Sequence, residues 1–143
     1  MDTNGKVNIT SNLLSNMEKT TGLIDLPSKE SFLDILKLDK VIIYLLVEWS
    51  GPERVSRAIV FNVLNELDRK NTPVFKIDCS DQKKEWFIDW LIEQRQEKND
   101  LYHGGWGETL LIEKGIITDF IKNPGRLGLD KTKDKLKEWL NAQ

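Results

Sequence analysis

The chain has 143 residues, of which 39% are hydrophobic and 31% are charged, and this length suits one domain with a core of its own. Its 21 Lys and Arg and 23 Asp and Glu give a formal net charge of -2, without the basic excess typical of proteins that bind nucleic acid or anionic membranes. A single Cys and a single His exclude an intrachain disulfide, a multi-cysteine metal site and a two-histidine zinc site. We therefore expect no metal and no cofactor.

The N-terminal 22 residues are polar and rich in Asn, Thr and Ser, which is typical of a mobile extension or of a loosely attached helix around residues 13–17. They lack the basic start and the apolar block of about 7–15 residues that a secretory signal needs. The longest apolar run of the chain, residues 41–47, is about a third of a membrane span. We expect a cytoplasmic protein outside the membrane, with residues 1–22 as an extension and 23–143 as the domain.

The first half of the domain predicts two strands and two helices. Residues 23–26 alternate between apolar and polar side chains, as a short strand does, and Pro27 ends that strand. Ser28 is a candidate N-cap for a helix with one apolar face. Residues 41–47 are continuously apolar and rich in β-branched side chains, which is typical of a central strand covered by helices on both faces. A second helix with an apolar face is predicted over residues 55–67.

The second half of the domain continues this alternation. Residues 73–78 predict a strand, and Asp81 begins a third helix. Two β-branched runs, at 109–112 and 116–121, flank a short Gly-containing link and predict a β-hairpin. Asp130 is the predicted cap of a last helix with one apolar face. This order predicts an α/β fold, a three-layer α/β/α sandwich around a mixed central sheet.

The turn between the strand at 41–47 and the following helix reads Trp49-Ser50-Gly51-Pro52-Glu53-Arg54. It resembles the active-site turn of thioredoxin, Trp-Cys-Gly-Pro-Cys-Lys, with both cysteines replaced. The resemblance covers residues 23–142: Lys76-Ile77-Asp78 is similar to the end of the third thioredoxin strand, and Thr109-Leu110-Leu111-Ile112-Glu113-Lys114-Gly115 to the penultimate strand and its turn. The chain therefore resembles a thioredoxin-like protein that lacks both cysteines, and this resemblance implies the thioredoxin-like three-layer sandwich.

The groups that carry thioredoxin chemistry are absent together. That chemistry needs a thiolate at a helix N-terminus and a second thiol that resolves the mixed disulfide, and Ser50 and Glu53 stand at those two positions. The buried Asp of the family aligns with Tyr44, its Lys neighbour with Val74, and its cis-proline with Glu108. The resemblance thus implies a redox-inactive protein without catalytic residues. The peptide bond before Glu108 should be trans, because a cis bond before a residue other than proline costs about 2.5–4 kcal/mol.

Ser50 and Glu53 also have the spacing of a capping box. In that motif Ser50 accepts a hydrogen bond from the amide three residues on, while the Glu53 carboxylate reaches back to the amide of the cap. We take this structural role as the leading interpretation, and direct contact with a ligand as the alternative.

The family resemblance also implies a groove for an extended polypeptide, between the active-site turn and the loop before the cis-proline. Exposed tryptophans are favourable anchors in such a surface, although Trp106 could instead cover a gap in the core. The candidate groove residues are Trp49, Ser50, Glu53, Trp106, Gly107 and Glu108.

The helix that begins at Asp81 is apolar over a wider arc than a surface helix needs. Its tryptophans, Trp86 and Trp90, are either covered by the chain itself, for instance by the N-terminal extension, or mark an interaction helix. The mixed charges along this helix indicate a solvated face.

These features favour a redox-inactive module that binds a polypeptide partner, and neither nucleic acid nor a membrane. The alternative is an enzyme that uses Cys79, or the region of Ser50, His103 and Glu108. Neither residue adjacent to Cys79 is basic, and Cys79 is more simply a small, mostly buried side chain. A hydrolytic triad would also need a third group that orients His103, and the sequence names none.

Overall fold

The computed structural model describes residues 23–26, 28–69, 72–94 and 104–141, so the predicted extension at 1–22 lies outside the described residues. Within these ranges, five strands form one mixed sheet in the order β1-β3-β2-β4-β5. The strands are β1 (Ile24–Asp25), β2 (Lys40–Leu46), β3 (Val74–Asp78), β4 (Thr109–Glu113) and β5 (Ile116–Ile121). Strands β1, β2 and β3 are parallel, whereas β4 pairs antiparallel with β2 and β5. The predicted hairpin is thus formed by β4 and β5.

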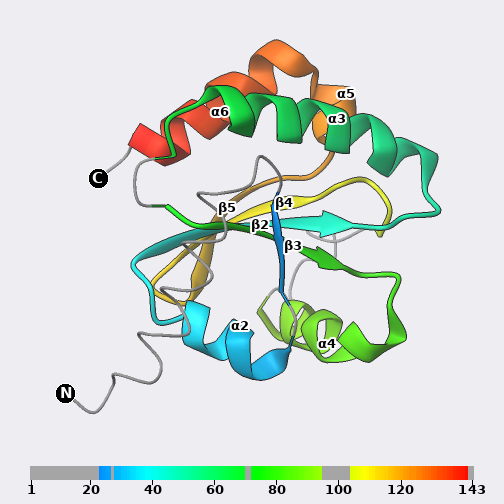
Figure 1. The fold of residues 1–143 in the computed structure, drawn as a ribbon, viewed down its shortest axis with the longest axis vertical. Coiled ribbons are helices and arrows are strands. Elements are labelled where there is room, and N and C mark those ends of the chain that lie inside the picture. Colours follow the sequence, from blue (N-terminus) through cyan, green and yellow to red (C-terminus); the bar gives the residue numbers. More distant parts are fainter. Residues whose placement is uncertain (1–22, 27, 70–71, 95–103, 142–143) are drawn as a thin grey trace.

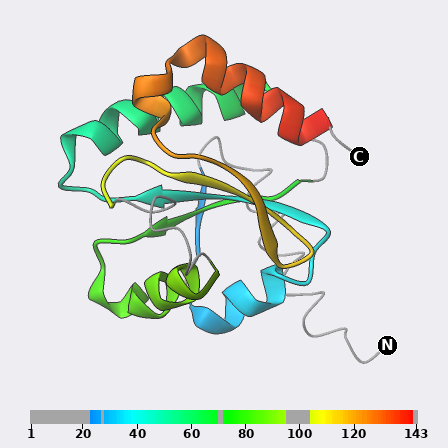
Figure 2. The same cartoon turned by 180° about the vertical axis from the view of Figure 1, so that it is seen from behind.

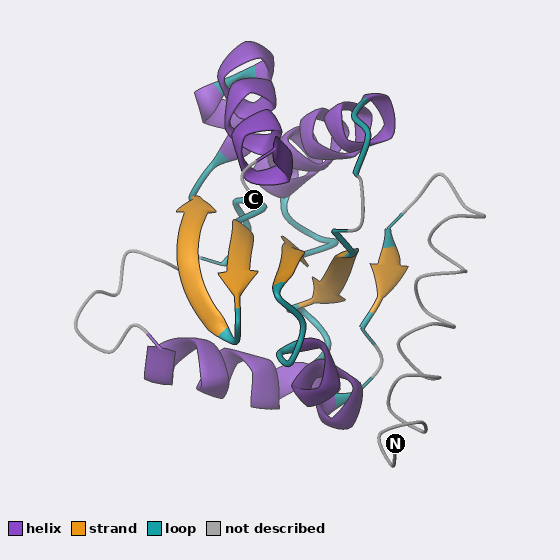
Figure 3. Ribbon diagram, turned by 90° about the vertical axis from the view of Figure 1, so that its left-hand side faces the viewer, coloured by secondary structure: helices purple, strands orange, loops and turns teal. Residues whose placement is uncertain are grey.

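Two helical layers enclose this sheet. The helices are α2 (Lys29–Ile35), α3 (Gly51–Glu66), the 3-10 helix η1 (Gln82–Lys84), α4 (Glu85–Gln94), α5 (Pro124–Leu127) and α6 (Leu129–Asn141). Helices α3, α5 and α6 cover one face, and α2 and α4 cover the other (Figures 1 and 2). In the perpendicular view, the strands form the middle of three layers (Figure 3). The predicted three-layer α/β sandwich is therefore confirmed. No helix in the described part of the chain is long and apolar enough to cross a membrane.

Strand β2 is central, and its side chains contribute to two hydrophobic cores, one on each face of the sheet. Ile42 and Tyr44 pack into the core below α3 and α6, and Val41, Ile43 and Leu45 pack into the core that includes α2 and α4. Every residue of β2 after Lys40 is buried. A strand covered on both faces has no solvated side, and this explains why its sequence is continuously apolar rather than alternating.

The predicted N-cap is observed at one helix but not at another. The Oγ of Ser28 accepts a hydrogen bond from the amide of Ser31 at 3.2 Å, which confirms the predicted N-cap of α2. The prediction that Asp130 caps the last helix is wrong, because α6 begins at Leu129 and Asp130 lies in its first turn. A short helix, α5, precedes it: the Asn123 side chain caps α5, and Pro124 occupies its first position, where no amide donor is needed.

The wide apolar arc of α4 packs in part against α2. The Phe32 ring of α2 lies with its centroid 5.5 Å from that of Trp86 and 4.8 Å from that of Trp90, and it meets Phe87 edge to face at 5.4 Å. Both tryptophans remain half-buried. Phe32 is therefore the residue around which the α2–α4 layer is assembled.

Replacing Phe32 with Ala should lower the free energy of unfolding by about 3–5 kcal/mol, because the substitution leaves a cavity among three aromatic rings. Leu33, the next residue along α2, is 44% exposed, and Leu33→Ala should change stability by less than about 0.5 kcal/mol. Urea unfolding followed by circular dichroism measures both. Equal effects of the two substitutions would contradict this account of the layer.

Candidate functional site

The site predicted from the sequence lies where β2 ends and α3 begins. Ser50 is the N-cap of α3: its Oγ accepts a hydrogen bond from the amide of Glu53 at 3.4 Å, and Pro52 lies in the first turn. The capping role of Ser50 is thus confirmed. The predicted return bond, from the Ser50 amide to the Glu53 carboxylate, is wrong. The Ser50 amide donates to the carbonyl of Val47 at 3.0 Å, and the Glu53 carboxylate has other partners.

The Glu53 side chain is 0% exposed and lies in a network of charge-assisted hydrogen bonds. The Tyr44 hydroxyl donates to Oε2 at 2.5 Å, and the Arg57 guanidinium donates to the same oxygen at 3.0 Å and also to Oε1. Two-point binding by Arg and a phenol donor satisfy a carboxylate that would otherwise be costly to bury. We call Tyr44, Glu53 and Arg57 the Glu53 cluster.

The environment keeps both donors of the Glu53 cluster protonated. Burial, reinforced by the Glu53 carboxylate, raises the pKa of Tyr44 far above its ordinary value. The hydrogen bond with Glu53 raises the pKa of Arg57 as well. In the resemblance read from the sequence, Tyr44 and Glu53 align with the buried Asp and the second Cys of thioredoxin. Two positions that serve proton transfer and disulfide resolution in thioredoxin are therefore joined here by a hydrogen bond.

The loop at 104–108 is fastened across the start of α3. The Ser50 hydroxyl donates to the carbonyl of Gly105 at 2.5 Å, and the Ser56 hydroxyl donates to the carbonyl of Trp106 at 2.6 Å. Within the loop, the Gly104 amide donates to Oε2 of the buried Glu108 at 2.9 Å. The Gly107–Glu108 bond is trans, as predicted, since the described chain contains no cis peptide bond.

Close approach of this loop to α3 requires glycine at position 107. Gly107 has a φ of +77°, and a Cβ there would lie 2.5 Å from the Cβ of Ser56 and 2.7 Å from the hydroxyl of Tyr44. A residue with an L side chain at this position would therefore strain the backbone, and its Cβ would collide with Ser56 and Tyr44.

This packing divides the candidate groove residues into two groups. Four of them are buried: Ser50, Glu53, Gly107 and Glu108. Trp49 is 72% exposed, and Trp106 is half-buried with the Nζ of Lys122 at 5.4 Å from its ring centroid. Polypeptide binding by these residues stays a prediction, and the two tryptophans are the members of the set whose side chains reach the surface.

Two of the remaining sequence candidates lie in the opposite helical layer. Trp86 and Trp90 pack on Phe32 there, and their role as an interaction helix stays a prediction. Cys79 is half-buried after β3, where its amide donates to the carbonyl of Leu46 at 2.8 Å. His103 lies outside the described residues. Within the described ranges, no group of three or more His, Cys, Asp or Glu side chains is arranged to hold a metal ion.

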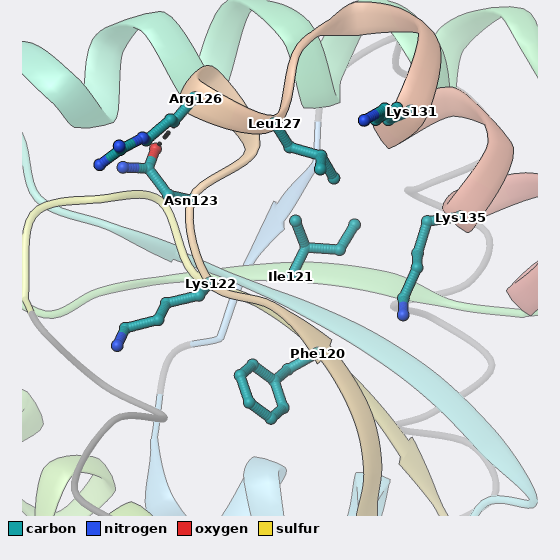
Figure 4. A pocket seen from close by; sticks show the side chains of 8 residues that line it. All are labelled: Phe120, Ile121, Lys122, Asn123, Arg126, Leu127, Lys131 and Lys135. Carbon is teal, nitrogen blue, oxygen red and sulfur yellow. Dashed lines mark hydrogen bonds between the residues drawn. The ribbon is translucent and has the colours of Figure 1, made fainter.

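A pocket that sequence reasoning missed opens between the end of β5 and helices α5 and α6 (Figure 4). Its volume is about 610 Å³, within the range of about 300–1,000 Å³ typical of ligand sites. An apolar floor and a rim of four cations form this basic pocket, which is lined by Phe120, Ile121, Lys122, Asn123, Arg126, Leu127, Lys131 and Lys135. The signal in the sequence is the recurrence of Lys and Arg from 122 to 135, which only the α5 turn brings around one hollow.

Gly107→Ala should destabilise the protein by about 2 kcal/mol or more, from the positive φ and the collision with Ser56 and Tyr44. Gly51 is the matched control, because a Cβ there would meet nothing within 4 Å. Gly51→Ala should leave stability unchanged or raise it by up to about 1 kcal/mol. Denaturant midpoints measure both, and a Gly107→Ala protein as stable as the wild type would refute the packing of the loop on α3.

No family model matches the chain, and no curated protein sequence matches it significantly. Solved structures do match. Thioredoxin f2 from Chlamydomonas reinhardtii has a TM-score of 0.60 and 16% identity, over 85% of this chain and 100% of that chain. Thioredoxin O2 from Arabidopsis thaliana has a TM-score of 0.57 and 13% identity, over 85% and 96%. A mutant thioredoxin from Halobacterium salinarum has a TM-score of 0.57 and 14% identity, over 86% and 95%. The resemblance read from the sequence is thus confirmed at the level of structure: this chain has the thioredoxin fold.

Proposed function

We propose that this protein is a redox-inactive thioredoxin-like module that binds a polypeptide segment at the surface of Trp49 and Trp106. The proposal rests on one observation. The start of α3, where thioredoxin carries its thiolate, is here closed by hydrogen bonds, while Trp49 beside it is 72% exposed.

The chemistry at the start of α3 argues against disulfide exchange. Ser50 supplies a hydroxyl whose proton is donated to the carbonyl of Gly105, and a hydroxyl forms no disulfide. At the second position, the Glu53 carboxylate is held by Tyr44 and Arg57. The one cysteine of the chain, Cys79, has no second thiol with which to cycle.

Two features of the Trp49–Trp106 surface support polypeptide binding: hydrogen bonds hold its loop, and its outward side chains are aromatic. The two tryptophans flank the hydrogen bond between Ser50 and Gly105, one from each chain segment. Because the loop is already fastened by Ser50 and Ser56, a partner would not have to order it on binding. Large aromatic side chains on such a surface are the residue type most often found at binding hot spots.

The enzymatic alternative has less support. A nucleophilic Ser50 would need a base to take its proton, but its hydroxyl donates to a backbone carbonyl and the residue is 5% exposed. The Glu108 carboxylate is fully buried and accepts from the amide of Gly104, within its own loop.

In an insulin-reduction assay with dithiothreitol, the purified protein should reduce insulin no faster than a blank without protein. The Cys79→Ser variant should give the same rate. Turnover that is lost in Cys79→Ser would assign a thiol activity to that residue, and turnover that survives it would assign one to another group. Either result would contradict a redox-inactive module.

Selection from a displayed library of random peptides tests the binding role. The wild-type protein should enrich peptides whose affinity falls at least about tenfold in Trp49→Ala, as loss of a hot-spot side chain does. Ile116→Ala is the matched control, because Ile116 is 62% exposed at the opposite end of the sheet, and it should bind these peptides as the wild type does. No enrichment, or peptides bound equally by Trp49→Ala, would contradict the proposed surface.

A further inference from the structure

The basic pocket holds three cations that no carboxylate in the described part of the chain neutralises. Lys135 is ion-paired with Asp119, whose Oδ2 lies 3.2 Å from its Nζ. Among the described residues, no carboxylate lies within ion-pair distance of the other three rim cations, Lys122, Arg126 and Lys131. The formal net charge of the chain is -2, so this is a local concentration of positive charge and not a reflection of the composition.

Three described acidic residues of β5 and α6, Asp119, Asp130 and Asp134, form no ion pair with Lys122, Arg126 or Lys131. Burial alone would raise the pKa of Asp119, but hydrogen bonds from Trp139, the Phe120 amide and Lys135 hold it below its ordinary value. Asp119 therefore stays ionised and fastened to α6, with the Trp139 Nε1 at 2.9 Å from its Oδ2. Asp130 and Asp134 of α6 are exposed and form no ion pair with the rim among the described residues.

The floor of the basic pocket is apolar. Ile121 from the end of β5 and Leu127 from α5 form it, with the rim cations around them, whereas the Phe120 ring lies on the other side of the β5 ribbon and packs against the core of α2 and α4 (Figure 4). A small inorganic anion would leave this floor unused, whereas a segment with an acidic and an apolar side chain close together would satisfy both parts of the pocket.

The basic pocket and the Trp49–Trp106 surface are continuous. Lys122 belongs to the rim of the pocket and also lies over the ring of Trp106. A single hydroxyl joins the two sides: Ser56 donates to the carbonyl of Trp106 at 2.6 Å and accepts from the amide of Gly125 in α5 at 2.8 Å. A polypeptide segment on Trp106 therefore needs only to continue past Lys122 to reach the pocket.

We propose that the basic pocket binds an acidic stretch of the polypeptide partner, with its carboxylates on Lys122, Arg126 and Lys131 and an apolar side chain on the floor. This inference rests on the proposed function and specifies the chemistry of the partner. A segment of this kind places opposite charges against the rim without requiring any of the buried residues of the site to move.

The peptides enriched by the random library supply the probes. Peptides that depend on Trp49 should be rich in Asp and Glu, and fluorescence anisotropy should show weaker binding as the NaCl concentration rises. The triple variant Lys122→Gln, Arg126→Gln and Lys131→Gln should weaken their binding about tenfold. The matched control, Lys29→Gln, Lys114→Gln and Lys137→Gln, removes the same number of charges from exposed residues outside the pocket and should bind normally.

The outcomes separate the two proposals. Trp49-dependent peptides without acidic enrichment, or equal binding by the rim variant and the control, would overturn the acidic partner and leave the proposed function standing. Peptides that depend on the rim but not on Trp49 would support the pocket and overturn the Trp49–Trp106 surface. A library without any enriched peptide would overturn both. Arg126 and Lys131 are exposed, and half-buried Lys122 has no described carboxylate as ion-pair partner, so denaturant unfolding of the rim variant should match that of the control.

Discussion

A carboxylate buried at the start of a helix is stable only when its charge is compensated, and Glu53 meets this condition through Tyr44 and Arg57. This interaction joins two elements of the fold, because Tyr44 comes from the central strand β2 and the other two residues from successive turns of α3. The helix is thereby held against the sheet at the edge where the turn and the loop at 104–108 meet.

The closed site and the exposed surface are consequences of the same packing. Gly107 fits against Tyr44 and Ser56 only because it lacks a side chain, and its neighbour in the loop, Trp106, is half-buried. Ser56 extends the connection to α5 and so to the basic pocket. In this protein the start of α3 is closed by hydrogen bonds, and the exposed Trp49 and the basic pocket are the surfaces that we propose for a polypeptide partner.

The fold could be predicted from the sequence because its signals are local, whereas the site depends on contacts between distant residues. The continuous run in β2 and the cap at Ser50 each follow from a few neighbouring residues. Sequence spacing placed Glu53 in a capping box, but Tyr44, nine residues earlier, supplies a buried donor that the spacing could not reveal. Helix α5 was missed although Asn123 and Pro124 are a cap signal, because it is only four residues long. The basic pocket appears only when that turn folds back over β5.

The most direct test of this account is a double-mutant cycle on the Glu53 cluster. The free energy of unfolding would be measured by urea denaturation for the wild type, Tyr44→Phe, Glu53→Gln and the double variant. If Tyr44 and Glu53 act as one network, the account predicts a coupling free energy of about 0.5–3 kcal/mol, with the double variant less destabilised than the sum of the single ones. Effects of the two substitutions that simply add would contradict it.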